Sequence, residues 1–211
     1  MTTTGQRGVS LLIVLIMLVI IGLTSAASLR SASSNERISN NFRMHALAEH
    51  YAEAALRYCE MQLTLADSAR VNSLQDASLR AFTGAAYPAW ANTLTWTGAG
   101  GASASLTRVP EALVASADSA FKPAQLPQCA VESLSIPLTQ NGEPAGAADI
   151  YVITARGFST DYSASASAQA VSLAGSVVWL QSVVSVRRAA TAEAGTLADR
   201  VWRRIINPPV S

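Results

Sequence analysis

Residues 9–29 read VSLLIVLIMLVIIGLTSAASL, a stretch without a charged side chain, and this stretch decides the fold. Arg7 precedes it and Arg30 follows it. As a helix, the 22 uncharged residues from Gly8 to Leu29 would span about 33 Å at ~1.5 Å per residue, close to the hydrocarbon thickness of a bilayer. A helix of a soluble protein has a polar face, whereas residues 11–21 are apolar all round. The sequence therefore predicts one membrane-spanning helix.

The rest of the chain has the size and charge of one exported globular domain. About 180 residues remain, which suits a single domain. Charged residues make up 14% of the chain and the net charge is +1, so electrostatics gives no case for nucleic-acid binding. Two cysteines, Cys59 and Cys129, are compatible with one disulfide in an oxidising compartment.

Two interpretations of the N-terminus follow from its residues, and a third rests on a resemblance to a known family. The positive-inside rule places Arg7 in the cytoplasm and the rest of the chain outside it. In the first interpretation the apolar stretch is an ordinary signal peptide, cut at Thr24-Ser25-Ala26 or Ser25-Ala26-Ala27. In the second it is an anchor that is never cut. In the third, Gly8 ends a leader that is removed while the apolar helix is kept.

A second helical segment follows the apolar stretch. Residues 36–65 contain neither proline nor glycine, and good helix formers dominate their second half. We expect one long helix, bent or locally melted between Gly22 and Ser34, where small and hydroxyl residues are frequent. Six residues at spacings of four and three predict its buried stripe: Leu47, Tyr51, Ala54, Tyr58, Met61 and Leu65.

No chemical site is apparent in this helix or elsewhere. His45, Glu49 and His50 suggest a metal site, but their spacing is one residue longer than that of the zincin and inverted zincin motifs. The two histidines also lie about 140° apart around a helix. Nucleotide-binding motifs and Cys/His metal spacings are absent from the sequence. A Ser-His-Asp site is hard to build, because the only two histidines both lie on the helix. The sequence predicts a non-enzyme without cofactor or metal.

Residues 84–128 are rich in glycine and proline and contain Trp90 and Trp96. These tryptophans form either a surface patch for contact with a ligand or the core of a domain with few other aromatic residues. We expect a short strand at Thr93–Thr97 and a short helix that begins at Pro110.

After Cys129 the pattern is typical of strands. Residues 134–138 alternate apolar and polar side chains, and Pro137 favours an edge strand. Asn141-Gly142 predicts a turn, and residues 163–170 a flexible connection. Ile150–Ala155 and Val177–Val186 predict two further strands in a small antiparallel sheet, and residues 191–206 a last helix.

The N-terminus resembles the signal of type IV prepilins. Gln6-Arg7-Gly8 followed by Val9-Ser10-Leu11-Leu12 is similar to the site at which a prepilin peptidase cuts after the glycine and methylates the new N-terminus. The resemblance implies cleavage between Gly8 and Val9 and N-methylation of Val9, with the apolar helix retained as membrane anchor and filament core.

The following helix and two strands extend the resemblance to PilX-type minor pilins. Asn35-Glu36-Arg37, Asn41, Arg43 and the run from Ala52 to Arg57 are similar to the helix of that family. Residues 151–157 and 178–183 resemble its final paired strands.

The resemblance implies an α+β fold, the pilin-like lollipop, in which a long N-terminal helix packs on a small antiparallel sheet. Its parts are a leader (1–8), a transmembrane and filament-core helix (9–29), the soluble half of that helix (30–66) and a periplasmic globular head (67–211). The location implied is the bacterial inner membrane, crossed once, and afterwards the pilus at the cell surface.

The function implied is that of a minor pilin that joins the minor-pilin complex priming type IV pilus assembly, at or near the filament tip. This role supports piliation, adhesion and motility. The partners implied are other minor pilins, the major pilin, the prepilin peptidase, the inner-membrane assembly platform and a tip adhesin.

One position departs from the family pattern. Most pilins have a glutamate five residues into the mature chain, and here that residue is Ile13. A buried carboxylate is costly unless it is paired, so its absence suggests a subunit with no neighbour that needs the contact, such as the first or tip subunit. The departure also resembles the K-type minor pseudopilin of type II secretion, which has a much larger head. A rival from another class is an envelope-anchored binding domain unrelated to filaments.

The two cysteines are the remaining prediction. A bridge between Cys59 and Cys129 would close a loop of about 70 residues, worth roughly 4 kcal/mol in the chain-entropy model. Two unpaired buried thiols are the alternative.

Overall fold

The computed structural model describes residues 9–81, 89–97, 106–114, 118, 121–134, 139–140, 143–144, 149–165, 172–188 and 194–206. Contacts divide the chain into two units, Met1–Arg43 and Met44–Ser211. The first contains the N-terminal stretch of helix α1 (Val9–Thr64). The second, called here the globular unit, contains the rest of α1 and all the strands.

The helix α1 is continuous over its whole length, so the predicted local melting between Gly22 and Ser34 is wrong. Hydroxyl side chains in that region bond back to the helix: Thr24 Oγ1 donates to the Ile20 and Ile21 carbonyls, both at 3.0 Å, and Ser28 Oγ donates to the Thr24 carbonyl at 2.9 Å. These bonds satisfy the hydroxyl groups without any change in the backbone.

Short elements, two of them strands of the main sheet, lie between α1 and β3 in the chain. Their bounds are η1 Asp67–Ala69, η2 Asn72–Leu74, η3 Asp76–Ser78, β1 Arg80–Ala81, η4 Ala89–Ala91, α2 Thr93–Thr97, β2 Leu106–Arg108 and α3 Glu111–Val114. The short helix after Pro110 is thereby confirmed. The strand predicted at Thr93–Thr97 is wrong, because these residues form α2, whose Thr95 N–H bonds to the Asn92 carbonyl at 3.1 Å.

The remaining strands have clear bounds: β3 Gln128–Leu134, β4 Thr139–Gln140, β5 Glu143–Pro144, β6 Asp149–Phe158, β7 Ser163–Ala164, β8 Ser172–Ala174, β9 Val177–Arg188 and β10 Gly195–Ile205. Six of the strands form one sheet in the order β1-β3-β6-β9-β10, with β2 also paired to β3. The pairs are antiparallel except for β1 with β3, which is parallel, so the sheet is larger than predicted and mixed.

Two predicted strands are confirmed and a predicted helix is wrong. The strands β6 and β9 include Ile150–Ala155 and Val177–Val186, and β6 lies between β3 and β9 as a central strand. The tail predicted as a helix forms β10, which pairs along β9 from Gly195 opposite Arg188 to Ile205 opposite Trp179. The flexible connection predicted for residues 163–170 is wrong at Ser163–Ala164, which form β7 and pair with β8. The predictions for Pro137, Asn141-Gly142 and residues 166–170 lie outside the described residues.

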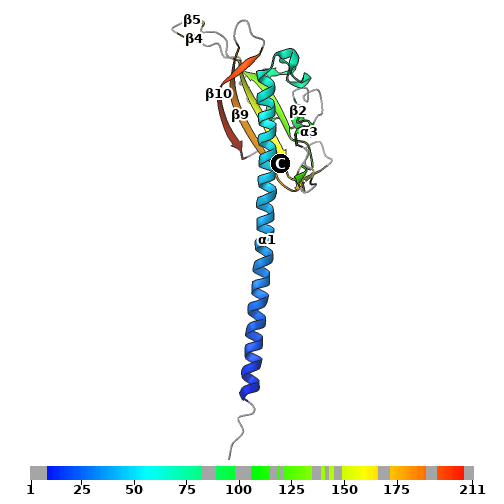
Figure 1. Cartoon of the computed structure of the whole chain (residues 1–211), viewed down its shortest axis with the longest axis vertical. Helices are drawn as coiled ribbons and strands as arrows, with labels where there is room; N and C mark the ends of the chain where they lie inside the picture. The colour runs from blue at the N-terminus through cyan, green and yellow to red at the C-terminus, as the bar shows by residue number, and fades with distance from the viewer. Residues whose placement is uncertain are drawn as a thin grey trace, which may run out of the picture. The chain divides into compact units, whose positions relative to one another are not determined.

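The helix α1 packs through its C-terminal part on one face of the sheet, as Figure 1 shows. Its fully buried residues there are Ala48, Ala52, Ala55, Cys59 and Leu63. The predicted stripe is therefore displaced: Tyr58 is buried, but Met61 is half exposed. The fold is α+β with a pilin-like layout, a long N-terminal apolar helix followed by a sheet.

Small residues dominate this contact because the backbones approach closely. A Cβ atom placed on Gly157 of β6 would lie 2.2 Å from the Ala48 carbonyl oxygen and 2.2 Å from the Ala52 nitrogen. Only a glycine facing alanines permits this approach.

Candidate functional site

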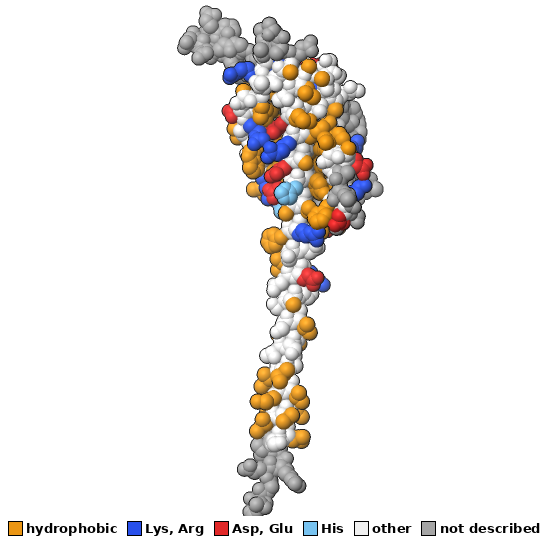
Figure 2. Space-filling model, in the orientation of Figure 1, with side chains coloured by type: hydrophobic (Ala, Val, Ile, Leu, Met, Phe, Trp, Pro, Cys, Tyr) orange, Lys and Arg blue, Asp and Glu red, His pale blue; other side chains and the backbone are white. Residues whose placement is uncertain are grey.

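The residues 9–29, called here the anchor segment, present apolar side chains on every side of α1. Each side chain from Ser10 to Leu29 is exposed. Figure 2 shows hydrophobic side chains gathered around the start of the helix, with charged side chains only farther along it. By length and composition, this helix is able to cross a membrane. The structure therefore supports a membrane anchor.

The structure places the residues of the predicted processing site only in part. Gly8 lies outside the described residues, and Val9 is the first residue of α1. Ile13 lies within the first turns of this helix with half of its side chain exposed. Cleavage after Gly8 and methylation of Val9 remain predictions.

The predicted disulfide is present. Cys59 on α1 and Cys129 on β3 are bonded, with their Cα atoms 6.6 Å apart and both residues fully buried. The bond joins residues 70 apart in the sequence and ties the helix to the sheet.

A buried glutamate makes a second link between helix and sheet. Glu60 accepts a hydrogen bond from Ser182 Oγ of β9 at 2.9 Å. It also forms an ion pair with Arg200 of β10, whose Nη1 atom lies 3.2 Å from the carboxylate. A buried carboxylate is tolerated only when it is paired in this way. The buried carboxylate of Glu60 is therefore stabilised only when both β9 and β10 are packed beside the helix.

Arginines also cover the C-terminal end of α1, where backbone carbonyls lack helical partners. Arg188 Nη2 donates to the Leu63 carbonyl and Arg70 Nε to the Leu65 carbonyl, both at 3.2 Å. Arg188 also pairs with Asp149 of β6, and Arg70 pairs with Asp76 at 2.7 Å. Burial lowers the pKa of Arg188. Positive charge at this end of a helix is favourable because it complements the helix dipole.

The opposite face of the sheet carries a second, aromatic core. Trp96 and Trp179 meet edge to face, with ring centroids 4.6 Å apart, and Trp90 packs against them. Trp96 is almost fully buried and donates from Nε1 to the Trp90 carbonyl at 2.8 Å. Of the two alternatives for these tryptophans, the core applies to Trp96, while the half-buried Trp90 lines a groove.

Arg156 of β6 is buried within this aromatic core. Its guanidinium carbon lies 5.0 Å from the Trp96 ring centroid, 5.1 Å from that of Phe158 and 5.3 Å from that of Trp179. It donates to neutral oxygens, Gln128 Oε1 at 2.7 Å and the Trp96 carbonyl at 2.9 Å. Burial lowers the pKa of Arg156 to about 10. The ring faces help to stabilise the cation, which fixes α2 on the sheet.

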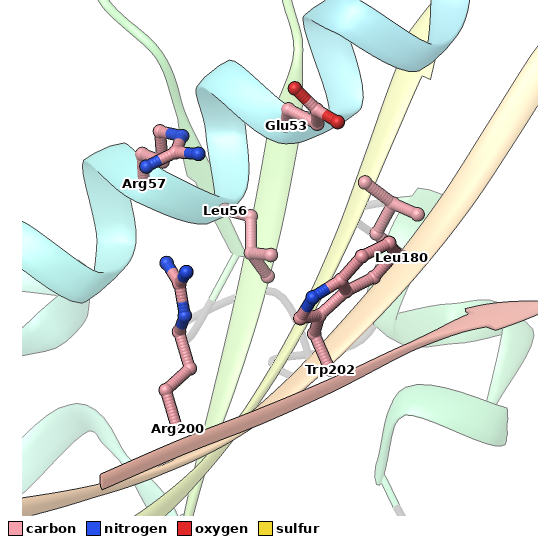
Figure 3. A pocket seen from close by; sticks show the side chains of 6 residues that line it. All are labelled: Glu53, Leu56, Arg57, Leu180, Arg200 and Trp202. Carbon is pink, nitrogen blue, oxygen red and sulfur yellow. The ribbon is translucent and has the colours of Figure 1, made fainter.

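Two hollows flank the edge strand β10. On the side of α1, a cavity of about 90 Å³ is lined by Glu53, Leu56, Arg57, Leu180, Arg200 and Trp202. Figure 3 shows Arg200 and Trp202 rising from β10 toward Leu56 of the helix. On the other side, a groove of about 460 Å³ runs over Val152, Val183 and Val201 to Trp90.

The described part of the chain gives no support to a metal site, since no group of three His, Cys, Asp or Glu side chains there could hold an ion. His45 instead contacts Arg204, and that arginine also lies 4.0 Å from Glu49.

Sequence reasoning missed the contacts of β10 because the tail was assigned to a helix. The available signal was the alternation of residues 201–205, in which Val201, Arg203 and Ile205 share one face.

In comparisons with known proteins, no family model, no curated protein and no solved structure matches this chain.

Proposed function

We propose that the chain is a minor pilin of the PilX type, which joins the minor-pilin complex that primes type IV pilus assembly. The observation that carries the proposal is the anchor segment, which begins directly after Gly8 and is the start of one uninterrupted helix, α1, that ends at Thr64. A signal peptide that is cut at its C-terminal end would break this helix. A leader cut at Gly8 would leave it whole.

The mechanism is assembly by helix packing. In the inner membrane the anchor segment lies in lipid and the globular unit in the periplasm. Association in lipid depends on close packing and on small residues, which Gly22, Ser25 and Ala26 supply along the apolar helix. Other minor pilins, the major pilin, the assembly platform and a tip adhesin are the partners in this proposal, and the role is not catalytic.

The isoleucine at position 13 favours a position of the subunit at or near the tip. A pilin inside the filament has a neighbour whose amino terminus needs a carboxylate partner. A subunit with an isoleucine at this position cannot supply that partner, so it suits an end of the assembly better than its middle.

N-terminal analysis of the mature protein by mass spectrometry tests the proposal. In cells that contain a prepilin peptidase, we expect a chain that begins at methylated Val9. The variant Gly8→Val should keep its leader, whereas the control Gly5→Val, which alters another glycine of the same leader, should be processed normally.

Two other results would contradict the proposal. A chain that starts at Ala27 or Ser28 would identify an ordinary signal peptide, and an intact Met1 would identify a plain anchor. For the priming role, deletion of the gene should reduce the number of pili on the cell surface, and unchanged piliation would argue against it.

A further inference from the structure

The groove on the face of the sheet opposite α1 has a floor of three valines that lie abreast on neighbouring strands. Val152 of β6 is opposite Val183 of β9, and Val183 is opposite Val201 of β10. Leu134 and Trp90 line the groove on the side of β3. Val183 and Val201 are 41% and 66% exposed, so much of this apolar floor is accessible to a ligand.

Arg203 is the one charged side chain among the described residues that line the groove. Its Nε donates to Gln181 Oε1 at 3.0 Å, and Gln181 Nε2 donates in turn to Thr154 Oγ1 at 2.9 Å. These two bonds orient the guanidinium beside the valines. Its two Nη groups have no acceptor among the described residues, and no carboxylate there pairs with Arg203. A guanidinium fork of this kind matches the two oxygens of a carboxylate.

The other two arginines of β10 do not contribute to the groove, because they point to the side of α1. Arg200 forms an ion pair with Glu60, and Arg204 lies 4.0 Å from Glu49. Those charges are balanced within the globular unit. Arg203, which alternates with them along the strand, is the arginine of β10 whose charge is not balanced in this way.

Two acidic residues on the face of the groove are too far from Arg203 to neutralise it. Glu132 of β3 is buried and accepts a hydrogen bond from the Trp90 N–H at 3.3 Å. The strands β6 and β9 separate it from β10, a distance of about 14 Å at ~4.8 Å per strand. Asp199 lies four residues before Arg203, about 13 Å at ~3.3 Å per residue. Both distances exceed the screening length of ~8 Å at physiological ionic strength.

The backbone beneath the valines favours an alkyl chain over a peptide. Strand β6 is paired on both sides, with β3 and β9, and β9 is paired with β6 and β10. The floor therefore offers no free backbone N–H or carbonyl group. A peptide that lay across the valines would bury amide groups without partners, which is costly, whereas an alkyl chain has no polar groups to satisfy. The volume of about 460 Å³ lies in the range of small-molecule sites.

We propose that this groove binds a small amphiphile, an alkyl chain that ends in a carboxylate. The two Nη groups of Arg203 donate to the carboxylate oxygens. The chain lies across Val201, Val183 and Val152 and extends toward the ring of Trp90. This inference concerns the globular unit alone and does not depend on the proposed role in pilus assembly.

Photolabelling of the full chain in detergent micelles tests the proposal. The probe is octanoate with a diazirine at its apolar end, and mass spectrometry locates the labelled residues. We expect saturable labelling of β9 and β10 around Val183 and Val201, which unlabelled octanoate displaces. Octanol and octylamine with the same diazirine should label these strands at least about tenfold less, the equivalent of ~1.4 kcal/mol. All three probes should label the anchor segment, which provides an internal control for their entry into the micelle.

Two variants and one control locate the carboxylate. Arg203→Gln removes the cation and should decrease labelling of the groove by octanoate about tenfold or more, or ~1.4 kcal/mol. Val201→Glu places a carboxylate on the exposed part of the floor and should abolish this labelling. Lys122→Gln removes an exposed cation outside the sheet and should leave it unchanged. An unchanged midpoint of chemical denaturation shows that each variant is folded.

Several outcomes would overturn the proposal. They are labelling of the groove by octanol as strong as that by octanoate, full labelling of the Arg203→Gln variant, or labelling that unlabelled octanoate does not displace. If a short peptide that ends in a valine carboxylate displaces the probe better than octanoate does, the groove binds a peptide C-terminus and the alkyl ligand is wrong. None of these results alters the expected cleavage after Gly8.

Discussion

Gly157 shows how one residue sets the distance between α1 and the sheet. Its missing side chain lets the backbone of β6 contact the backbone of α1 at Ala48 and Ala52. The stripe predicted from the sequence consists mainly of large apolar residues, whereas the residues that pack most closely on the sheet are alanines. The glycine on the facing strand explains why alanines occupy it instead.

Substitution of this glycine should therefore be severe. We expect Gly157→Ala to destabilise the globular unit by ~3 kcal/mol, which is the upper end of the usual cost of overpacking. The new methyl group would overlap backbone atoms of α1, which cannot move away as a flexible side chain can. Chemical denaturation followed by tryptophan fluorescence measures the change. Gly22→Ala is the control, since a Cβ atom there has nothing within 4 Å. Equal stability of the two variants would contradict the close contact.

Tyr151 should make the stability of the globular unit sensitive to alkaline pH. Burial raises the pKa of this tyrosine above its ordinary value of 10.0. The unfolded chain therefore loses the proton at a lower pH than the folded chain does. The stabilisation is fully present below pH 10 and is lost as the pH rises through the folded-state pKa.

Denaturation at a series of pH values around 10 measures this effect. The wild type should lose stability with rising pH more steeply than Tyr151→Phe, which has no proton to lose. The hydroxyl group contacts Arg188 at 3.4 Å, so the variant should also be slightly less stable at neutral pH. Parallel pH profiles for the two proteins would show that Tyr151 does not titrate differently in the folded state.

At the scale of elements, the disulfide is expected to contribute most to the attachment of α1 to the sheet. Reduction should lower the free energy of unfolding by roughly 4 kcal/mol, because the bond closes a long loop in the unfolded chain. Denaturation with and without reductant gives this value. The double variant Cys59→Ala, Cys129→Ala should unfold at the midpoint of the reduced protein and should not respond to reductant. A midpoint that reductant leaves unchanged in the wild type would contradict the prediction.

The elements that the sequence predicted well are those with an unambiguous local pattern. The anchor segment is apolar over residues 11–21, residues 150–155 of β6 are apolar except for Thr154, and β9 has an apolar face interrupted only by Ser182. The tail alternates only over residues 201–205, and its Ala, Leu and Arg residues favour a helix as isolated residues. Pairing with β9 overrides this preference, and pairing is a tertiary effect that local propensity does not contain.

The links between elements were beyond sequence reasoning for a related reason. The predicted buried stripe of the helix does not include Glu60, because a charged residue usually lies on the exposed side of a helix. Its partners Ser182 and Arg200 are 122 and 140 residues away in the sequence. Similarly, nothing local indicates that Arg156 will be enclosed by Trp96 and Trp179. The cysteines were predictable because a disulfide needs only two candidates.

At the scale of the whole molecule, the two units have different solvents. The anchor segment exposes apolar side chains throughout, whereas the globular unit encloses apolar clusters on both faces of its sheet. The anchor segment is therefore favourable in lipid, and the globular unit is favourable in water. Removal of residues 1–29 should therefore yield a chain that remains in the soluble fraction and retains the disulfide between Cys59 and Cys129.

A pair of charge substitutions tests the same division in the full chain. Val19→Arg places a cation at the middle of the anchor segment, which costs ~3 kcal/mol on membrane-insertion scales, whereas Ser28→Arg lies near its end, where the side chain reaches the interface at little cost. Membrane integration, measured by resistance to carbonate extraction, should decrease for Val19→Arg and remain normal for Ser28→Arg. If Val19→Arg integrates as well as the wild type, the middle of the anchor segment does not lie at the centre of the bilayer.

If the chain without residues 1–29 still sediments with membranes, the globular unit has its own attachment to lipid or to a membrane protein. The anchor segment is then not what holds the molecule at the membrane.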